Sequence, residues 1–267
     1  MNTTLFKTSI HRFCKAITID TSWPEQADHD PQEKERAERA LSSFQNFLVT
    51  AFQAFHRVAE RTVLSPYSVI YRWPGKQESR KTHKPVLLLA HYDVVPADRE
   101  FWTTVPFGAE IREDFIYGRG TLGTKNTLTC AMEVAEFLVS EGFAPDRDIW
   151  FAFGGDEERS GACGAQKAAA WFAEQKLHFS WTLDEGSIVA LDQIPGVSKP
   201  LTLIGVEEKG FLDIELMVQQ NPGHALRPAE RQAVALYWPR HWFGFHTSRS
   251  PTGSSHRWNV SLWTLPL

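Results

Sequence analysis

Residues 85–93, "PVLLLAHYD", form a short apolar run that ends in polar side chains. Turn-forming residues stand on both sides of the run, which indicates a buried β-strand. Two later segments have the same form, "DIWFAFGGDEE" at 148–158 and "FSWTLDEGS" at 179–187. Residues 126–141 and 162–175 between them read as helices. Strands that alternate with helices predict an α/β fold whose sheet is at least partly parallel.

The segments outside this central pattern predict further elements. Apolar residues recur at helical spacing from Ala40 to Ala59, and residues 63–73 read as a strand. The polar, proline-containing residues 24–36 read as an exposed lead-in. "GFLDIELMVQ" at 210–219 alternates like a half-exposed strand and indicates an added antiparallel element or a second domain. After Leu236, an aromatic-rich tail shows neither helical nor strand periodicity.

Composition is that of an ordinary globular protein. The 267 residues are 42% hydrophobic and 22% charged, with a formal net charge of -4, which gives no reason to expect nucleic acid or an anionic membrane as a partner. Three scattered cysteines (Cys14, Cys130 and Cys163) fit a reducing compartment rather than a disulfide framework. No signal peptide and no apolar run of membrane-spanning length is apparent. We therefore expect a cytoplasmic protein.

Ionisable residues stand at the ends of all three central strands. The first strand ends in His91-Tyr92-Asp93, the second in Asp156-Glu157-Glu158 and the third in Asp184-Glu185. Ligands of open α/β sheets bind outside the carboxyl ends of the strands, so these side chains can converge. Each group alone has a structural explanation, as a strand-end histidine, a complement to a helix dipole or a turn residue. Together, one histidine and several carboxylates form the ligand set expected for zinc or a related divalent ion.

The order and spacing of the motifs resemble the M20 family of zinc metallopeptidases, in particular its carboxypeptidase S and N-acyl-amino-acid hydrolase branch. The resemblance runs from about Phe13 to Leu236. It is carried by five segments: "PVLLLAHYDVVPA", "FWTTVPFGAEIREDFIYGRGTLGTKN", "FAFGGDEERSG", "TLDEGS" and "NPGHALRP". It implies a zinc-exopeptidase-like, mostly parallel sheet flanked by helices, with the start of a smaller α+β lid or dimerisation domain.

The resemblance also implies roles for individual residues. His91 and Asp184 would bind the first of two zinc ions and Glu158 the second, while Asp93 would orient the His91 ring. Glu157 would be the general base for a zinc-activated water. His224, in the smaller domain, would stabilise the developing oxyanion, often in a partner subunit's active site. The implied substrates are peptides cut at their C-termini or N-acyl amino acids, and the implied partner is a second copy bound through the lid domain.

Two features depart from the family pattern. The family motif Gly-Arg-Gly-x-x-Asp-x-Lys carries an Asp that bridges both zinc ions, and this sequence has Gly123 at that position. The chain also stops at Leu267, before the family's return to the catalytic sheet and its last histidine ligand, as a truncated form would. We therefore expect residues 1–205 to form an incomplete catalytic domain, 206–236 to begin the lid domain, and 237–267 to be an atypical tail. Zinc binding is expected to be weak, partial or absent, and hydrolysis impaired.

Two other classes of function compete with this reading. A catalytically inactive remnant could serve as a binding or dimerisation module, and metal content with activity would separate it from an enzyme. A nucleotide-binding protein is suggested by "GRGTLG" at 118–123, which fits the G-x-G-x-x-G string, but the segment before it is short and charged instead of a buried strand. A serine hydrolase is disfavoured because the sequence has no G-x-S-x-G elbow.

Overall fold

The computed structural model describes residues 3–186, 189–191, 195–202 and 204–206. The chain divides into two units, Met1–Ser187 and Ile188–Leu267. In the second unit, the described residues form a small antiparallel hairpin of β8 (Val189–Ala190) and β9 (Leu201–Thr202). The expected lid domain and tail lie almost entirely outside the described residues, so their boundaries stay predictions.

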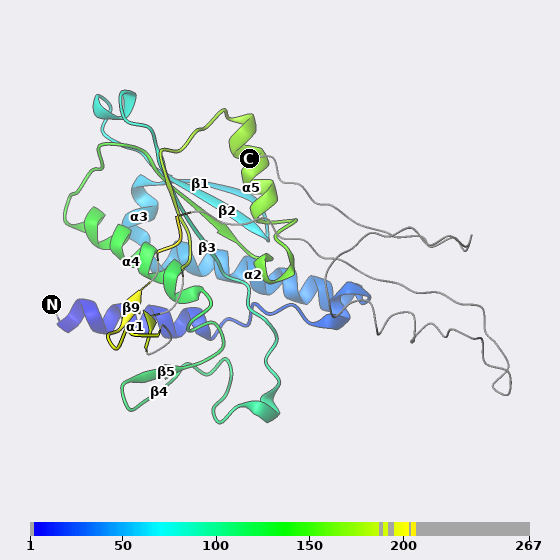
Figure 1. The fold of residues 1–267 in the computed structure, drawn as a ribbon. Coiled ribbons are helices and arrows are strands. Elements are labelled where there is room, and N and C mark those ends of the chain that lie inside the picture. Colours follow the sequence, from blue (N-terminus) through cyan, green and yellow to red (C-terminus); the bar gives the residue numbers. More distant parts are fainter. Residues whose placement is uncertain (1–2, 187–188, 192–194, 203, 207–267) are drawn as a thin grey trace, which may run out of the picture. The chain divides into compact units, whose positions relative to one another are not determined.

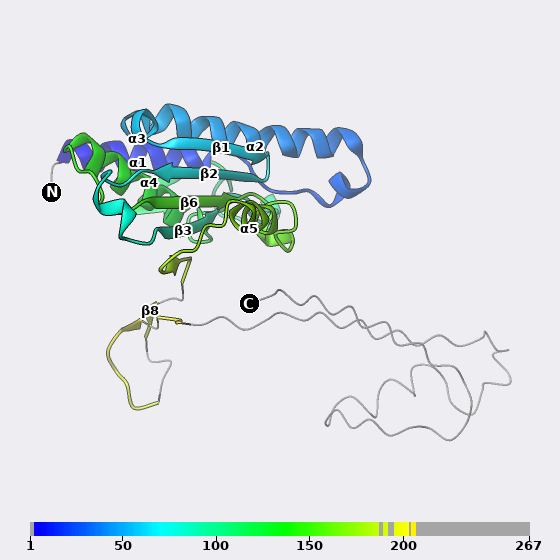
Figure 2. The same cartoon turned by 90° about the horizontal axis from the view of Figure 1, so that it is seen from above.

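A five-stranded mixed sheet forms the centre of the first unit. Its strands are β1 (Glu60–Ser65), β2 (Ser68–Trp73), β6 (Ile149–Gly154), β3 (Val86–His91) and β7 (Thr182–Leu183), in that spatial order. Figure 2 shows β1, β2, β6 and β3 side by side. β3 is parallel to β6 and to β7, whereas β2 is antiparallel to both β1 and β6. A second hairpin, β4 (Glu110–Arg112) with β5 (Phe115–Tyr117), stands apart from this sheet.

Helices cover both faces of the sheet (Figure 1). One face carries α2 (Pro31–Ala51), α3 (Gln53–Val58) and α4 (Lys125–Ser140), with α1 (Thr3–Ile17) packed against α4 and α2. The other face carries α5 (Ala165–Glu174). Short 3-10 helices occur at Glu25–Asp28, Ser79–Lys81, Arg99–Phe101 and Glu157–Arg159. None of the helices in the described part of the chain is long and apolar enough to cross a membrane.

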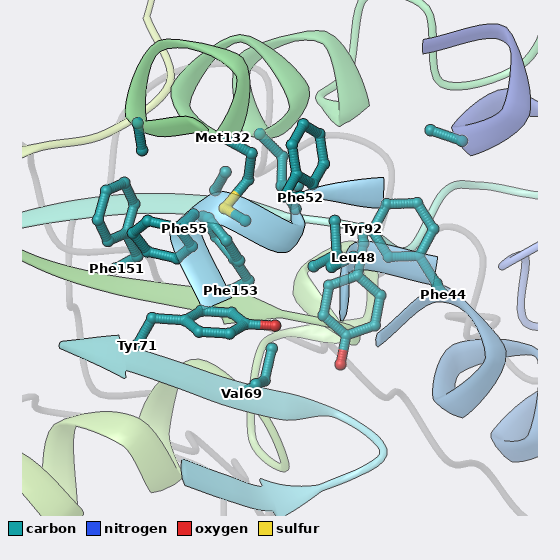
Figure 3. Close-up of a cluster of buried hydrophobic side chains, with 14 of the residues drawn as sticks. Phe44, Leu48, Phe52, Phe55, Val69, Tyr71, Tyr92, Met132, Phe151 and Phe153 are labelled. Carbon is teal, nitrogen blue, oxygen red and sulfur yellow. The ribbon is translucent and has the colours of Figure 1, made fainter. Parts of the chain in front are cut away.

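The larger core lies between the sheet and the layer of α2, α3 and α4. Phe55 of α3 sits in an aromatic cluster, with its ring 5.3 Å from that of Phe151 and 5.7 Å from that of Tyr71 (Figure 3). Met132 of α4 and Leu48 of α2 are completely buried in the same cluster. Substantial burial of aromatic side chains gives the sheet a rigid support, because such interiors are packed as densely as organic crystals.

The α/β fold predicted from the sequence is confirmed, with differences in detail. The single strand expected at 63–73 is wrong, because Pro66 and Tyr67 turn the chain and the segment forms the β1–β2 hairpin. The helix expected from Ala40 begins at Pro31, where the Asp30 side chain caps the helix by accepting a hydrogen bond from Gln32 N at 2.8 Å. Part of the expected lead-in is therefore helical.

Candidate metal centre

His91 stands at the carboxyl end of β3 and is almost completely buried, with a side chain only 6% exposed. Its Nδ1–H donates to the backbone oxygen of Asp93 at 3.0 Å and to Asp93 Oδ1 at 3.2 Å. The predicted pairing of Asp93 with the His91 ring is thus present in the structure. This contact fixes the orientation of the ring and directs Nε2 away from Asp93.

The Nε2 atom of His91 faces two carboxylates that come from neighbouring strand ends. Glu157 Oε2 lies at 3.7 Å and follows β6, and Glu185 Oε1 lies at 3.6 Å and follows β7. Because β6 and β7 flank β3 in parallel, all three side chains leave the sheet at the same edge. One donor atom from each residue lies within 4.8 Å of the others.

Asp93 also fixes the loop that carries Glu157. Its second carboxylate oxygen, Oδ2, accepts a hydrogen bond from the backbone N–H of Glu158 at 3.0 Å. One buried carboxylate therefore joins the histidine of β3 to the loop after β6. The Glu158 side chain itself is exposed and lies outside the group of donors around His91.

Buried contacts at the base of this loop hold it against the end of β3. Asp156 Oδ2 accepts a hydrogen bond from Cys163 N at 2.7 Å and so closes the loop between β6 and α5. Gly155 packs against the Tyr92 ring so closely that a Cβ there would lie 2.6 Å from Cε2. Tyr92 is in turn held by Gln45, whose Nε2 donates to the Tyr92 hydroxyl at 2.7 Å. The loop backbone that carries Glu157 is thus held by packed neighbours, while the Glu157 side chain is 53% exposed.

The Gly-rich loop 117–125 reaches the same edge of the sheet without contributing a carboxylate. A Cβ added at Gly120 would lie 2.9 Å from Val94 Cγ1, whereas a Cβ added at Gly123 would meet no atom within 4 Å. Lys125, at the start of α4, is completely buried and donates to the carbonyl oxygens of Ala16 at 3.1 Å and Ile19 at 2.7 Å. Close contacts at Gly120 and Lys125 therefore hold the loop in place, whereas the space beside Gly123 is open.

Charges around His91 set the protonation states of the centre. Burial lowers the pKa of His91, but the hydrogen bond and charge of Asp93, with the charges of Glu185 and Glu157, raise the pKa to about 9. The pKa of Glu157 is raised chiefly by burial, against the lowering effect of His91. A histidine that carries a proton at neutral pH between carboxylates occupies a position of strongly negative potential, which suits a cation.

The other predicted site residues lie elsewhere. Asp184 directly precedes Glu185 and accepts a hydrogen bond from Glu185 N at 2.8 Å, and it is not one of the three converging residues. His224 lies outside the described residues. The sequence placed Glu185 at the third strand end but assigned the ligand role to Asp184, because two adjacent acidic residues after a short strand give no signal of which one turns toward the histidine.

The chemistry of the three donors fits the divalent ion that the family resemblance implies. One imidazole nitrogen and two carboxylate oxygens match the ligand types that zinc takes in catalytic sites, and three is the usual number of protein ligands there. His91 and Glu185 would hold such an ion, and Glu157 faces the same space, with Asp93 in the supporting position.

Comparisons with known proteins identify relatives of this chain. The profile of Peptidase family M20/M25/M40 matches residues 87–235. "Probable carboxypeptidase S-like 2" of Dictyostelium discoideum is 37% identical over 229 residues, which are 84% of this chain and 43% of the relative. "N-fatty-acyl-amino acid synthase/hydrolase PM20D1" of Mus musculus is 36% identical over 199 residues, which are 74% of this chain and 39% of the relative.

Solved structures show the same fold at low sequence identity. The yeast di-peptidase Dug1p matches with a TM-score of 0.55 and 18% identity over 71% of this chain and 40% of its own. Human carnosine dipeptidase 1 matches with a TM-score of 0.53 and 15% identity over 68% of this chain and 40% of its own. The chain thus spans about 40% of the length of these relatives. The match to the family profile covers more than half of the sequence, and the chain belongs to peptidase family M20/M25/M40.

Proposed function

We propose that this chain carries the site of an M20-type metallohydrolase for amide bonds, with impaired chemistry. The observation that carries the proposal is the convergence of His91, Glu157 and Glu185 at the carboxyl edge of the sheet. The proposed substrates are peptides cut at the C-terminus or N-acyl amino acids, as the names of the relatives suggest for those proteins.

Each residue of the site contributes a separate part of the chemistry. A divalent ion, when bound, supplies a Lewis acid for the amide carbonyl and acidifies water. Where other residues complete the ligand set of the ion, Glu157 is the proposed general base, because a carboxylate with a raised pKa accepts a proton from water and returns it to the leaving amine. Asp93 keeps the His91 ring in one orientation through its two contacts with Nδ1. His224 remains the proposed oxyanion-stabilising group, and a homodimer through the smaller domain remains the proposed assembly.

Impairment follows from the ligand count. Gly123 offers no side chain at the position of the family's bridging Asp, so among the described residues the exposed Glu158 is the one proposed ligand left for a second ion. The second candidate function is therefore a catalytically inactive module for binding or dimerisation. It is favoured by this same Gly123, since a protein that only binds a partner needs no bridging carboxylate.

Hydrolysis assays on the wild type and a Gly123→Asp variant test the proposal. A Cβ at residue 123 meets no neighbour within 4 Å, so the aspartate can be introduced without repacking. With Zn²⁺ present, we expect little release of product from N-acyl amino acids or peptides by the wild type and at least about a tenfold faster release by Gly123→Asp. Equal absence of hydrolysis in both proteins would support the inactive module instead. Gly205→Asp, at another open glycine whose backbone is not in the left-handed region, serves as a control for added charge.

A further inference from the structure

We propose that this chain holds a single divalent cation between His91, Glu157 and Glu185, with Glu157 as a ligand instead of a general base. The inference rests on the proposed function in one respect only, which is that a divalent cation binds at the carboxyl edge of the sheet. It differs from the ligand set that the family resemblance implies in two residues: Glu185 replaces Asp184, and Glu157 takes the place that Gly123 leaves without a carboxylate.

The first support is the state of His91. Its side chain is 6% exposed, and Asp93 holds Nδ1 so that Nε2 is directed into the site. Both distances from Nε2 to the facing carboxylate oxygens exceed normal hydrogen-bond lengths. The buried Nε2 atom thus faces two carboxylates without a hydrogen bond to either. This arrangement is expected when a cation binds between the three groups.

The second support is the spacing of the donors. Zinc bonds of about 2.0–2.2 Å in tetrahedral geometry place two donor atoms about 3.3–3.6 Å apart. The separations from His91 Nε2 are 3.7 Å to Glu157 Oε2 and 3.6 Å to Glu185 Oε1. Both separations from Nε2 are therefore within a few tenths of an ångström of the value for two donors that share a zinc ion, and the two carboxylates come within 4.8 Å of each other.

The third support is the origin of the two carboxylates. Glu157 lies on the loop after β6, which hydrogen bonds to Asp93 and Asp156 hold in place. Glu185 follows β7, which pairs with β3 on the side opposite to β6. In the described part of the chain, no other residue belongs to this donor group, and the space beside Gly123 is open. Glu157 is thus the carboxylate available to complete a three-ligand site, and as a ligand it no longer serves as a base.

Zinc affinity measured in competition with a chromophoric chelator tests the assignment. We expect saturable Zn²⁺ binding by the wild type, and an affinity weakened at least about tenfold in Glu157→Gln and in Glu185→Gln, since even loss of an outer partner of a metal ligand costs about 10–100-fold. Asp184→Asn should retain the wild-type affinity within about twofold. Glu174→Gln, which removes an exposed carboxylate on α5, is the matched control.

The side chains of Glu157 and Glu185 are 53% and 39% exposed, so neither substitution leaves a cavity in the core. Equal melting temperatures in the presence of a chelator will establish that the variants fold, and the Zn²⁺-induced rise in melting temperature gives a second measure of binding. Absence of saturable binding by the wild type, or weakened binding in Asp184→Asn but not in Glu185→Gln, would overturn the assignment.

The role of Glu157 is tested separately in the Gly123→Asp background. There the new aspartate supplies the missing ligand, so Glu157→Gln should barely change Zn²⁺ affinity and should abolish whatever hydrolysis the background has. If Glu157→Gln leaves the affinity of the wild type unchanged, the inference fails while the proposed function stands. If zinc binds as inferred but Gly123→Asp hydrolyses nothing, the proposed function fails while the inference stands.

Discussion

At the scale of single residues, the protonation state of His91 controls both the stability of the metal-free fold and the binding of a metal ion. The pKa of about 9 lies above the ordinary value near 6.5, so protonated His91 stabilises the metal-free fold fully below about pH 6.5. This contribution is lost as the pH rises through about 9. A cation and this proton compete for Nε2, so metal binding and protonation are linked.

Zinc binding at pH 7 is therefore expected to release about one proton per ion, and the affinity should rise about tenfold per pH unit between pH 7 and 9. Calorimetric titration in two buffers with different ionisation enthalpies measures the number of protons. Binding without proton release would show that His91 is neutral or is not a ligand.

Asp93→Asn tests how the supporting carboxylate acts. Asparagine keeps an oxygen that can accept from His91 Nδ1 but removes the charge that raises the pKa of His91. We expect the pKa of His91 in the metal-free protein to fall and the Zn²⁺ affinity, corrected for competition with the His91 proton, to drop about 10–100-fold. A histidine titration by nuclear magnetic resonance measures the pKa. Asp114→Asn, at an exposed turn position with φ of 65° that asparagine tolerates, should leave both unchanged.

At the scale of elements, the site exists because three parallel strands end at one edge. The sequence predicted this arrangement from the three apolar runs and their ionisable ends, and it placed His91 beside Asp93. It could not predict that Glu185 faces His91, because the direction of a side chain after a two-residue strand depends on tertiary packing. The β1–β2 hairpin was missed because apolar residues stand on both sides of the turn at Pro66, so that the two strands read as one.

Lys125 illustrates how a helix outside the sheet is tied to the rest of the fold. Its ammonium group joins α4 to the end of α1 through the carbonyls of Ala16 and Ile19, and burial lowers its pKa to about 7. Lys125→Met should lower the free energy of unfolding by about 1–3 kcal/mol, because two carbonyls lose their donor.

Chemical denaturation at pH 8 measures this loss, since an amine with a pKa of about 7 is mainly uncharged there and the charge contributes little. Lys34→Met, on the exposed side of α2, should change stability by less than about 0.5 kcal/mol. An equal effect of both substitutions would show that the contacts with Ala16 and Ile19 contribute nothing.

At the scale of the whole molecule, an apolar groove lies at the β7 edge of the sheet. The groove has a volume of about 640 Å³ and lies among residues of β3, β7 and α4. Three of its apolar side chains are more than half exposed: Val134, Trp181 and Leu183. Exposed apolar surface of this kind marks an interaction site or an aggregation hazard.

We expect the groove to bind an apolar fluorescent dye and Val134→Glu to reduce the dye's fluorescence. The melting temperature should change little, because Val134 is an exposed position on α4. Val105→Glu, at an exposed valine outside the groove, should leave dye binding intact. Equal dye binding by all three proteins would place the apolar surface elsewhere.

The number of Zn²⁺ ions bound per chain at saturation tests the central claim most directly. Metal analysis after equilibrium dialysis of the wild type against excess Zn²⁺, with Glu185→Gln beside it to exclude loosely bound ions, gives this number. We predict one ion per wild-type chain at saturation and, at a Zn²⁺ concentration that only just fills the wild type, a largely empty site in Glu185→Gln. Two tightly held ions in the wild type, or none, would contradict a single-cation centre of His91, Glu157 and Glu185.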